Sequence, residues 1–92
     1  MIRSFEHKRL RLFFTTGSVA GINPQNSPRL EEILQALHTA ITVSDMDIPG
    51  LKFHLLKGYH AGLWAVTVSG NWRVTFAFKE GHAYVVNYED YH

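Results

Sequence analysis

The sequence predicts a single α+β domain over residues 1–92, with two N-terminal helices packed on one face of a small antiparallel sheet. First, 92 residues are too few for two independent cores, and 46% apolar with 18% charged residues is typical of a folded globular protein. Second, apolar residues recur at helical spacing up to Ile41 and alternate with polar residues from Leu51 onwards. Third, short turn-like segments separate the alternating stretches, as in a meander of hairpins.

The first helix is predicted over residues 7–16, after a weak signal for a short strand over residues 2–5. Leu10, Phe13 and Phe14 fall at helical spacing, and Gly17 stands where a helix C-cap belongs. A loop rich in Gly, Ser, Asn and Pro follows, over residues 17–26.

The second helix is predicted to begin at Pro28 and to end near Ile41. Ser27 is a favourable N-cap, and proline is well tolerated at the first helical position. Acidic side chains at residues 31–32 complement the positive end of the helix dipole. The apolar face of this amphipathic helix consists of Leu30, Ile33, Leu34, Leu37 and Ile41.

Four strands are predicted in the second half, over residues 51–55, 64–68, 72–79 and 83–88. Their connections are hairpin-like, at residues 58–62, 69–71 and 80–81. Residues 83–88 are apolar on both faces, which indicates a central strand. If the alternating apolar side chains meet the helices, the uncovered face carries Lys52, His54, Arg73 and Thr75.

The composition excludes several classes of site. Without cysteine there is no disulfide scaffold, thiol nucleophile or thiolate metal site. The six histidines do not stand at the short spacings of a metal site and HExxH is absent, so we expect neither a metal nor another cofactor. No apolar run is long enough for a signal peptide or a membrane span, so we expect a cytoplasmic protein that does not bind membranes.

The charged residues are arranged in blocks, although the net charge is only +1. Five bases and one acid lie in residues 1–29, four acids in 30–50, four bases in 51–79 and three acids in 80–92. Such blocks allow a basic face that attracts an anionic partner. Ordinary scatter of charges over a small surface is the simpler explanation.

The uncovered face of the predicted sheet suits a phosphodiester. Cations at Lys52 and Arg73 neutralise phosphate charge, and the His54 imidazole can move protons near neutral pH. Asn71 lies in the turn before Arg73, and residues 88–92 follow the last strand, from which they can reach the same face. Plainer explanations exist: a surface histidine, a turn asparagine, and an arginine that is solvated or paired with an acid of a neighbouring strand.

Five short segments carry a resemblance to a known family. They are MIRSF at residues 1–5, HLLKG at 54–58, GLW at 62–64, VSGNWRVTF at 68–76 and NYEDYH at 87–92. In this order and spacing they resemble the HigB (host inhibition of growth) toxins, also called plasmid-maintenance killer proteins, of the RelE/ParE superfamily. The resemblance covers essentially the whole chain and implies a RelE/ParE-like fold.

The resemblance implies a bacterial type II toxin that enters the ribosomal A site, cleaves mRNA there and inhibits translation. The implied partner is a helix-turn-helix antitoxin of the HigA type, and DNA is contacted only through the complex with it. The implied chemistry is metal-free transesterification: the ribose 2′-OH attacks the adjacent phosphorus and leaves a 2′,3′-cyclic phosphate and a 5′-hydroxyl end. Such a reaction needs a base, an acid and cations at the phosphorane.

Four catalytic positions of the family match residues of this chain. His54 and His92 match the acid and base candidates, without an assignment of which is which. Tyr91 matches a residue that orients them or shares the proton transfer, and Arg73 matches the arginine that stabilises phosphate charge.

Two further positions match residues that bind substrate. Asn71 matches an asparagine that holds the scissile nucleotide, and Lys57 matches a nearby basic residue. Strict alternation places Lys57 on the same face as Phe53 unless the strand twists or ends at Gly58.

Two other functions stay open. A ParE-like toxin shares the fold but inhibits DNA gyrase and needs no histidine or tyrosine in a site. A simple RNA-binding module would stack bases on Trp64, Trp72 or Tyr91, although both tryptophans alternate with core positions. For the antitoxin or ribosomal RNA, the expected contacts are the bases of the helical half: Arg3, Lys8, Arg9, Arg11 and Arg29.

Overall fold

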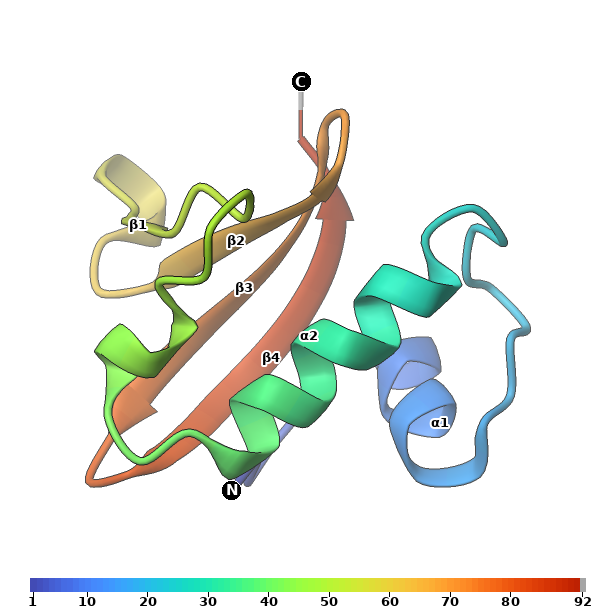
Figure 1. The fold of residues 1–92 in the computed structure, drawn as a ribbon, viewed down its shortest axis with the longest axis horizontal. Helices are drawn as coiled ribbons and strands as arrows, with labels where there is room; N and C mark the ends of the chain where they lie inside the picture. Colours follow the sequence, from blue (N-terminus) through green and yellow to red (C-terminus); the bar gives the residue numbers. More distant parts are fainter. Residues whose placement is uncertain (92) are drawn as a thin grey trace.

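The computed structural model describes residues 1–91, and their arrangement is the α+β fold that the sequence predicts (Figure 1). Two helices come first, and an antiparallel sheet of four strands follows in the order β1-β2-β3-β4. The elements are α1 (Lys8–Thr16), α2 (Ser27–Thr39), the 3-10 helix η1 (Val43–Met46), β1 (His54–Leu55), the 3-10 helix η2 (Gly58–His60), β2 (Trp64–Ser69), β3 (Trp72–Lys79) and β4 (His82–Asp90). No helix in this part of the chain is long and apolar enough to cross a bilayer.

Helix α1 forms where its pattern predicts, and both of its ends are capped. The His7 imidazole accepts a hydrogen bond from the Leu10 N–H at 3.0 Å. Gly17 ends the helix with a φ of 78°, and its N–H donates to the Phe13 carbonyl oxygen. Leu10 and Phe13 are buried, and α1 lies beside α2, beyond β4 (Figure 1).

Asn26 is the N-cap of α2, one residue before the predicted cap at Ser27. Its side chain does not cap the helix and is used in a tertiary contact instead. The Asn26 Nδ2 donates to the Tyr88 hydroxyl at 2.6 Å, and its Oδ1 accepts a hydrogen bond from the Ser69 hydroxyl. Because Asn26 is only 1% exposed, these bonds satisfy a buried amide and fix the start of α2 to β2 and β4.

Helix α2 ends at Thr39, so the prediction that Ile41 belongs to its apolar face is wrong. Ile41 is 79% exposed. The Asp45 carboxylate accepts hydrogen bonds from the N–H groups of Ile41 and Thr42, at 2.8 and 3.1 Å, and these bonds hold the chain in a non-helical path after Thr39. These two hydrogen bonds hold the pKa of Asp45 below its ordinary value, and the bond from Thr42 has the larger effect.

The core lies between the helices and one face of the sheet. Val74 pairs with Val66 on one side and Tyr88 on the other, and all three belong to the same buried cluster as the apolar residues of α1 and α2. Trp72 stacks on Tyr88 with ring centroids 4.6 Å apart. Trp64 stacks in the same way on the phenylalanine that immediately precedes β1. Both tryptophans therefore pack against protein rings, as their alternation indicates.

Strand β4 is the last strand of the sheet, so its prediction as a central strand is wrong. Its outer edge is nevertheless covered by the first six residues. Isolated parallel bridges join Ile2 to Ala83 and Phe5 to Val86, and the Glu6 N–H donates to the Val86 carbonyl oxygen at 2.9 Å. This cover explains why β4 is apolar on both faces, and the weak strand signal over residues 2–5 corresponds to these bridges.

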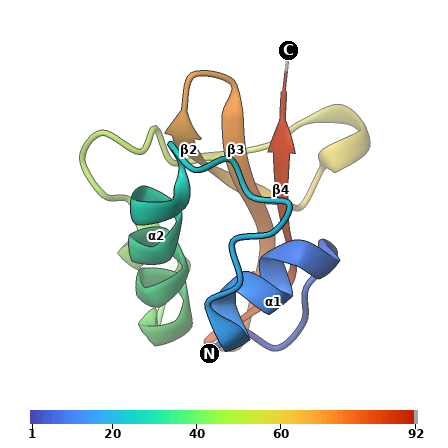
Figure 2. The same ribbon diagram turned by 90° about the vertical axis from the view of Figure 1, so that its right-hand side faces the viewer.

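Strand β1 is shorter than predicted and contains only His54 and Leu55. Lys52 interrupts the extended chain with a φ of 51°, in the left-handed region. The alternation shifts as a result: Leu55 is 50% exposed and Leu56 only 8%. The chain leaves the sheet after Leu55, and the η2 segment lies on the side of the sheet opposite α2 (Figure 2).

Candidate active site

Cross-strand pairing gathers polar residues on the sheet face opposite α2, here called the open face. One row across the four strands comprises His54, Ala65, Thr75 and Asn87. The next row comprises Thr67, Arg73 and Glu89. Since these rows alternate with the rows of core residues, their side chains share the open face. The open face thus carries both His54 and Arg73, as the alternation predicts.

A cleft of about 340 Å³, here called the His54 cleft, opens on this face next to η2. Four of the six predicted site residues line it: His54, Lys57, Arg73 and Tyr91. Lys57 reaches the cleft because β1 ends at Leu55 and the chain turns into η2, the exception that the alternation argument allowed. Two cations, an imidazole and a phenol are therefore brought together by the fold.

The His54 side chain is exposed, but one of its ring nitrogens is held. Nδ1 lies 2.7 Å from the carbonyl oxygen of Lys52. A carbonyl oxygen only accepts hydrogen bonds, so Nδ1 must carry the hydrogen. Nε2 is therefore the nitrogen that remains to accept or release a proton in the cleft.

Arg73 is buried instead of solvated, with 8% of its surface exposed. Its guanidinium forms an ion pair with Glu89 at 3.4 Å, the pairing with a neighbouring strand that one reading of the sequence predicts. The guanidinium carbon also lies 3.9 Å from the centroid of the Tyr91 ring. The Nε atom is buried and has no hydrogen-bond partner within residues 1–91. The arginine is thus fixed in place, and one of its donors is left without a partner in the described chain.

Asn71 and Tyr91 are linked through the backbone. The Tyr91 N–H donates to the Asn71 carbonyl oxygen at 2.8 Å, which ties the end of β4 to the β2–β3 turn. Asn71 itself is exposed and does not line the His54 cleft. His92, the second predicted acid or base, lies outside the described residues.

Sequence reasoning missed His60, which lines the His54 cleft beside Lys57. Unlike His54 and His92, it is considered in the sequence analysis only as a metal ligand. Its place three residues after Lys57, in the loop that leaves β1, is the signal that could have identified it. Within the described residues, no group of three or more His, Cys, Asp or Glu side chains is placed to hold a metal ion.

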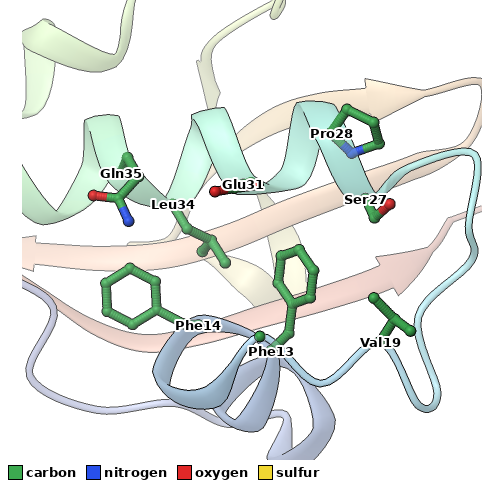
Figure 3. Close-up of a pocket in the computed structure, with 9 residues that line it drawn as sticks. Phe13, Phe14, Val19, Ser27, Pro28, Glu31, Leu34 and Gln35 are labelled. Atoms are coloured by element: carbon green, nitrogen blue, oxygen red, sulfur yellow. The ribbon is translucent and has the colours of Figure 1, made fainter.

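Another hollow, of about 370 Å³, lies between α1 and α2 (Figure 3). The Phe13 and Leu34 side chains point toward one another there, with Phe14 and Val19 on the same side as Phe13. Its lining is partly apolar and partly polar and belongs to the helix layer, on the other side of the sheet from the His54 cleft. It carries no imidazole and no cation among its lining residues, and Glu31 is the ionisable residue that lines it.

Comparison with known proteins gives two findings. Residues 3–92 match the model of the HigB-like toxin family, described as the RelE-like toxin of the type II toxin–antitoxin system HigB. The chain is also 46% identical over 92 residues to the endoribonuclease HigB of Proteus vulgaris, and the match covers 100% of both chains. Both findings agree with the α+β fold and with the resemblance of the sequence segments. The chain belongs to the HigB-like family of RelE-like toxins of type II toxin–antitoxin systems.

Proposed function

We propose that this toxin is an endoribonuclease that cuts mRNA in the ribosomal A site by attack of the ribose 2′-OH on the adjacent phosphorus. The observation that carries the proposal is the convergence of His54, Lys57, Arg73 and Tyr91 on one cleft. The name of the Proteus vulgaris relative, an endoribonuclease, supports RNA as the substrate. An antitoxin partner follows from the family.

The proposed reaction is a transesterification that the side chains of the cleft perform. A base takes the proton of the 2′-OH as its oxygen bonds to phosphorus, and an acid gives a proton to the departing 5′-oxygen as the P–O5′ bond breaks. The products are a 2′,3′-cyclic phosphate and a 5′-hydroxyl end. His54, through Nε2, and His92 fill the acid and base roles, and the Tyr91 hydroxyl shares in the proton transfer.

Charge stabilisation falls to Arg73 and Lys57. The phosphorane carries an additional negative charge, and preorganised cations lower its energy more than they lower that of the substrate. Arg73 is preorganised because Glu89 and the Tyr91 ring hold its guanidinium. Lys57 is exposed at the start of η2, where it lines the same cleft as Arg73. Asn71, in the turn above the end of β4, is proposed to hold the scissile nucleotide.

The antitoxin is proposed to be a helix-turn-helix protein of the HigA type that binds the basic helical half. Exposed bases at Lys8, Arg9 and Arg11 of α1 motivate this proposal, and the same residues could instead hold ribosomal RNA. The toxin then meets DNA only through the antitoxin, and its site of action is the cytoplasm. Charge reversal at Arg9 and Arg11 should weaken binding to one of these partners. Unchanged affinity for both would contradict the proposal.

The test is primer extension on a defined mRNA with purified toxin, in the presence and absence of programmed ribosomes. Cleavage is expected only with ribosomes. Lys57→Ala should reduce the rate by about tenfold or more, since a cation at the phosphorane is lost. Lys79→Ala, which removes an exposed lysine at the far end of β3, should not. Absence of cleavage in both conditions contradicts the proposal and makes inhibition of DNA gyrase the next assay.

A further inference from the structure

A second cleft lies beside the His54 cleft on the open face. Its volume is about 310 Å³. The floor comes from β3 and β4, one wall from the loop that carries η2, and the other wall from the N-terminal segment. The lining includes Glu6, His60, Leu63, Val85, Asn87 and Glu89. His60 lines both clefts, so the two adjoin.

The two clefts differ in charge. Lys57 and Arg73 line the His54 cleft, whereas the second cleft is lined by the carboxylates of Glu6 and Glu89. Within residues 1–91, no lysine or arginine lines the second cleft. Glu89 is ion-paired with Arg73, so the carboxylate that repels a phosphate from the second cleft is that of Glu6. The second cleft therefore suits an uncharged part of the substrate.

Asn87 gives the second cleft hydrogen-bonding groups that the fold does not use. Its amide offers two N–H donors and a carbonyl acceptor, and it makes no side-chain hydrogen bond to the rest of the described chain. The Glu6 carboxylate adds an acceptor on the facing wall. Amides and carboxylates are the side chains that recognise amino groups on base edges. Leu63 and Val85 supply apolar contact for the faces of a ring.

The distance between the two clefts fits neighbouring parts of one nucleotide chain. Arg73 and Glu89 are cross-strand partners, and adjacent strands lie about 4.8 Å apart. A phosphate held by Arg73 is therefore about one strand spacing from the edge of the second cleft. The cleft volume of about 310 Å³ is at the lower end of the range for small-molecule sites, which is room for a planar base.

We propose that the second cleft binds the base of a nucleotide next to the scissile phosphate and prefers a base with an exocyclic amino group over uracil. Asn87 and Glu6 are the specificity-determining residues. This proposal rests on the proposed ribonuclease function and adds the part of the substrate that the second cleft recognises.

The experiment uses ribosomes programmed with mRNAs that differ only in one nucleotide flanking the cleavage site, on the 5′ side in one set and on the 3′ side in the other. At the position that occupies the second cleft, wild-type toxin should cut the messages with A, C or G about tenfold faster than that with U. Asn87→Ala and Glu6→Ala should each bring this ratio close to one. Glu32→Ala, on the exposed side of α2, removes an equal charge and acceptor outside the cleft and should keep the wild-type ratio.

Equal cleavage of all four messages at both positions overturns the assignment of the second cleft while leaving the ribonuclease function intact. A wild-type ratio in both cleft variants also overturns it. Complete absence of cleavage by the wild type overturns the ribonuclease function, and this proposal with it. If Asn87→Ala proves unfolded in a thermal melt, Glu6→Ala decides alone, because Glu6 is exposed and the loss of its side chain does not disturb the core.

Discussion

The guanidinium carbon of Arg73 lies 3.9 Å from the centroid of the Tyr91 ring, and Glu89 pairs with the same guanidinium from the neighbouring strand. The backbone of Tyr91 is held as well, by its hydrogen bond to the Asn71 carbonyl oxygen. A buried cation, the turn before it and the end of the last strand therefore form one unit. Tyr91 is placed at the His54 cleft by the fold itself, before any substrate binds.

Tyr91→Phe separates the ring of this residue from its hydroxyl. The phenylalanine ring keeps the contact with Arg73, so the melting temperature should stay close to that of the wild type. The proton of the hydroxyl is lost, and single-turnover cleavage on programmed ribosomes should slow by about tenfold or more. Tyr91→Ala should lower both the rate and the melting temperature. An unchanged rate in Tyr91→Phe would assign Tyr91 an orienting role through its ring alone.

The Lys52 carbonyl sets the tautomer of His54. In the neutral imidazole, ¹⁵N NMR should find the hydrogen on Nδ1, because that nitrogen donates to the carbonyl oxygen at 2.7 Å. Lys52→Gly should retain this tautomer, since glycine adopts the observed φ of 51° without strain. Lys52→Val removes the same charge but disfavours that φ, so hydrogen should appear on Nε2 and cleavage should slow. The Nδ1–H tautomer in both variants would show that the backbone of Lys52 does not control it.

Asn26→Ala tests the buried link between α2 and the sheet. The substitution leaves the hydroxyls of Tyr88 and Ser69 without their amide partner, so the free energy of unfolding in urea should fall by about 1–3 kcal/mol. Asn23→Ala is the matched control, because the Asn23 side chain accepts only a local hydrogen bond from the Gln25 N–H. Its effect should stay within about 0.5 kcal/mol. Equal losses in the two variants would contradict a special role for Asn26.

The end of α2 predicts a difference between two aliphatic residues that share the same sequence periodicity. Leu37 is completely buried, so Leu37→Ala should lower the free energy of unfolding by about 2–5 kcal/mol. Ile41 lies beyond the helix and is exposed, so Ile41→Ala should change it by no more than about 0.5 kcal/mol. Similar losses from both substitutions would mean that the helix extends to Ile41 in solution.

The sequence predicts the parts of this fold that depend on local patterns. The helical spacing of Leu10 and Phe13 with Gly17 behind them, and the alternation in residues 72–79, lead directly to α1 and β3. The wrong predictions concern places where residues outside the local periodic pattern determine where an element ends or what covers it. Asp45 ends α2 before Ile41, and the covering of β4 by residues 1–6 depends on a parallel contact across the whole chain.

In the candidate site, too, the local pattern predicts some positions and the folded structure determines the others. The alternation places His54 and Arg73 on one face, and the structure has them there. The left-handed backbone of Lys52 carries no sequence signal, because lysine is not one of the residues that favour this region. For that reason the early end of β1 and the approach of His60 to the cleft could not be derived from the period of the strand. The burial of Arg73 required the positions of Glu89 and Tyr91, which only the folded sheet supplies.

The central claim is that the His54 cleft catalyses attack by the ribose 2′-OH. The most direct measurement uses an mRNA that carries a single 2′-deoxynucleotide at the mapped cleavage site and compares it with the all-ribose message on programmed ribosomes. The all-ribose message should be cut to a 2′,3′-cyclic phosphate and a 5′-hydroxyl end, and the 2′-deoxy message should remain intact at that site. Cleavage of the 2′-deoxy message at the same position would contradict the mechanism.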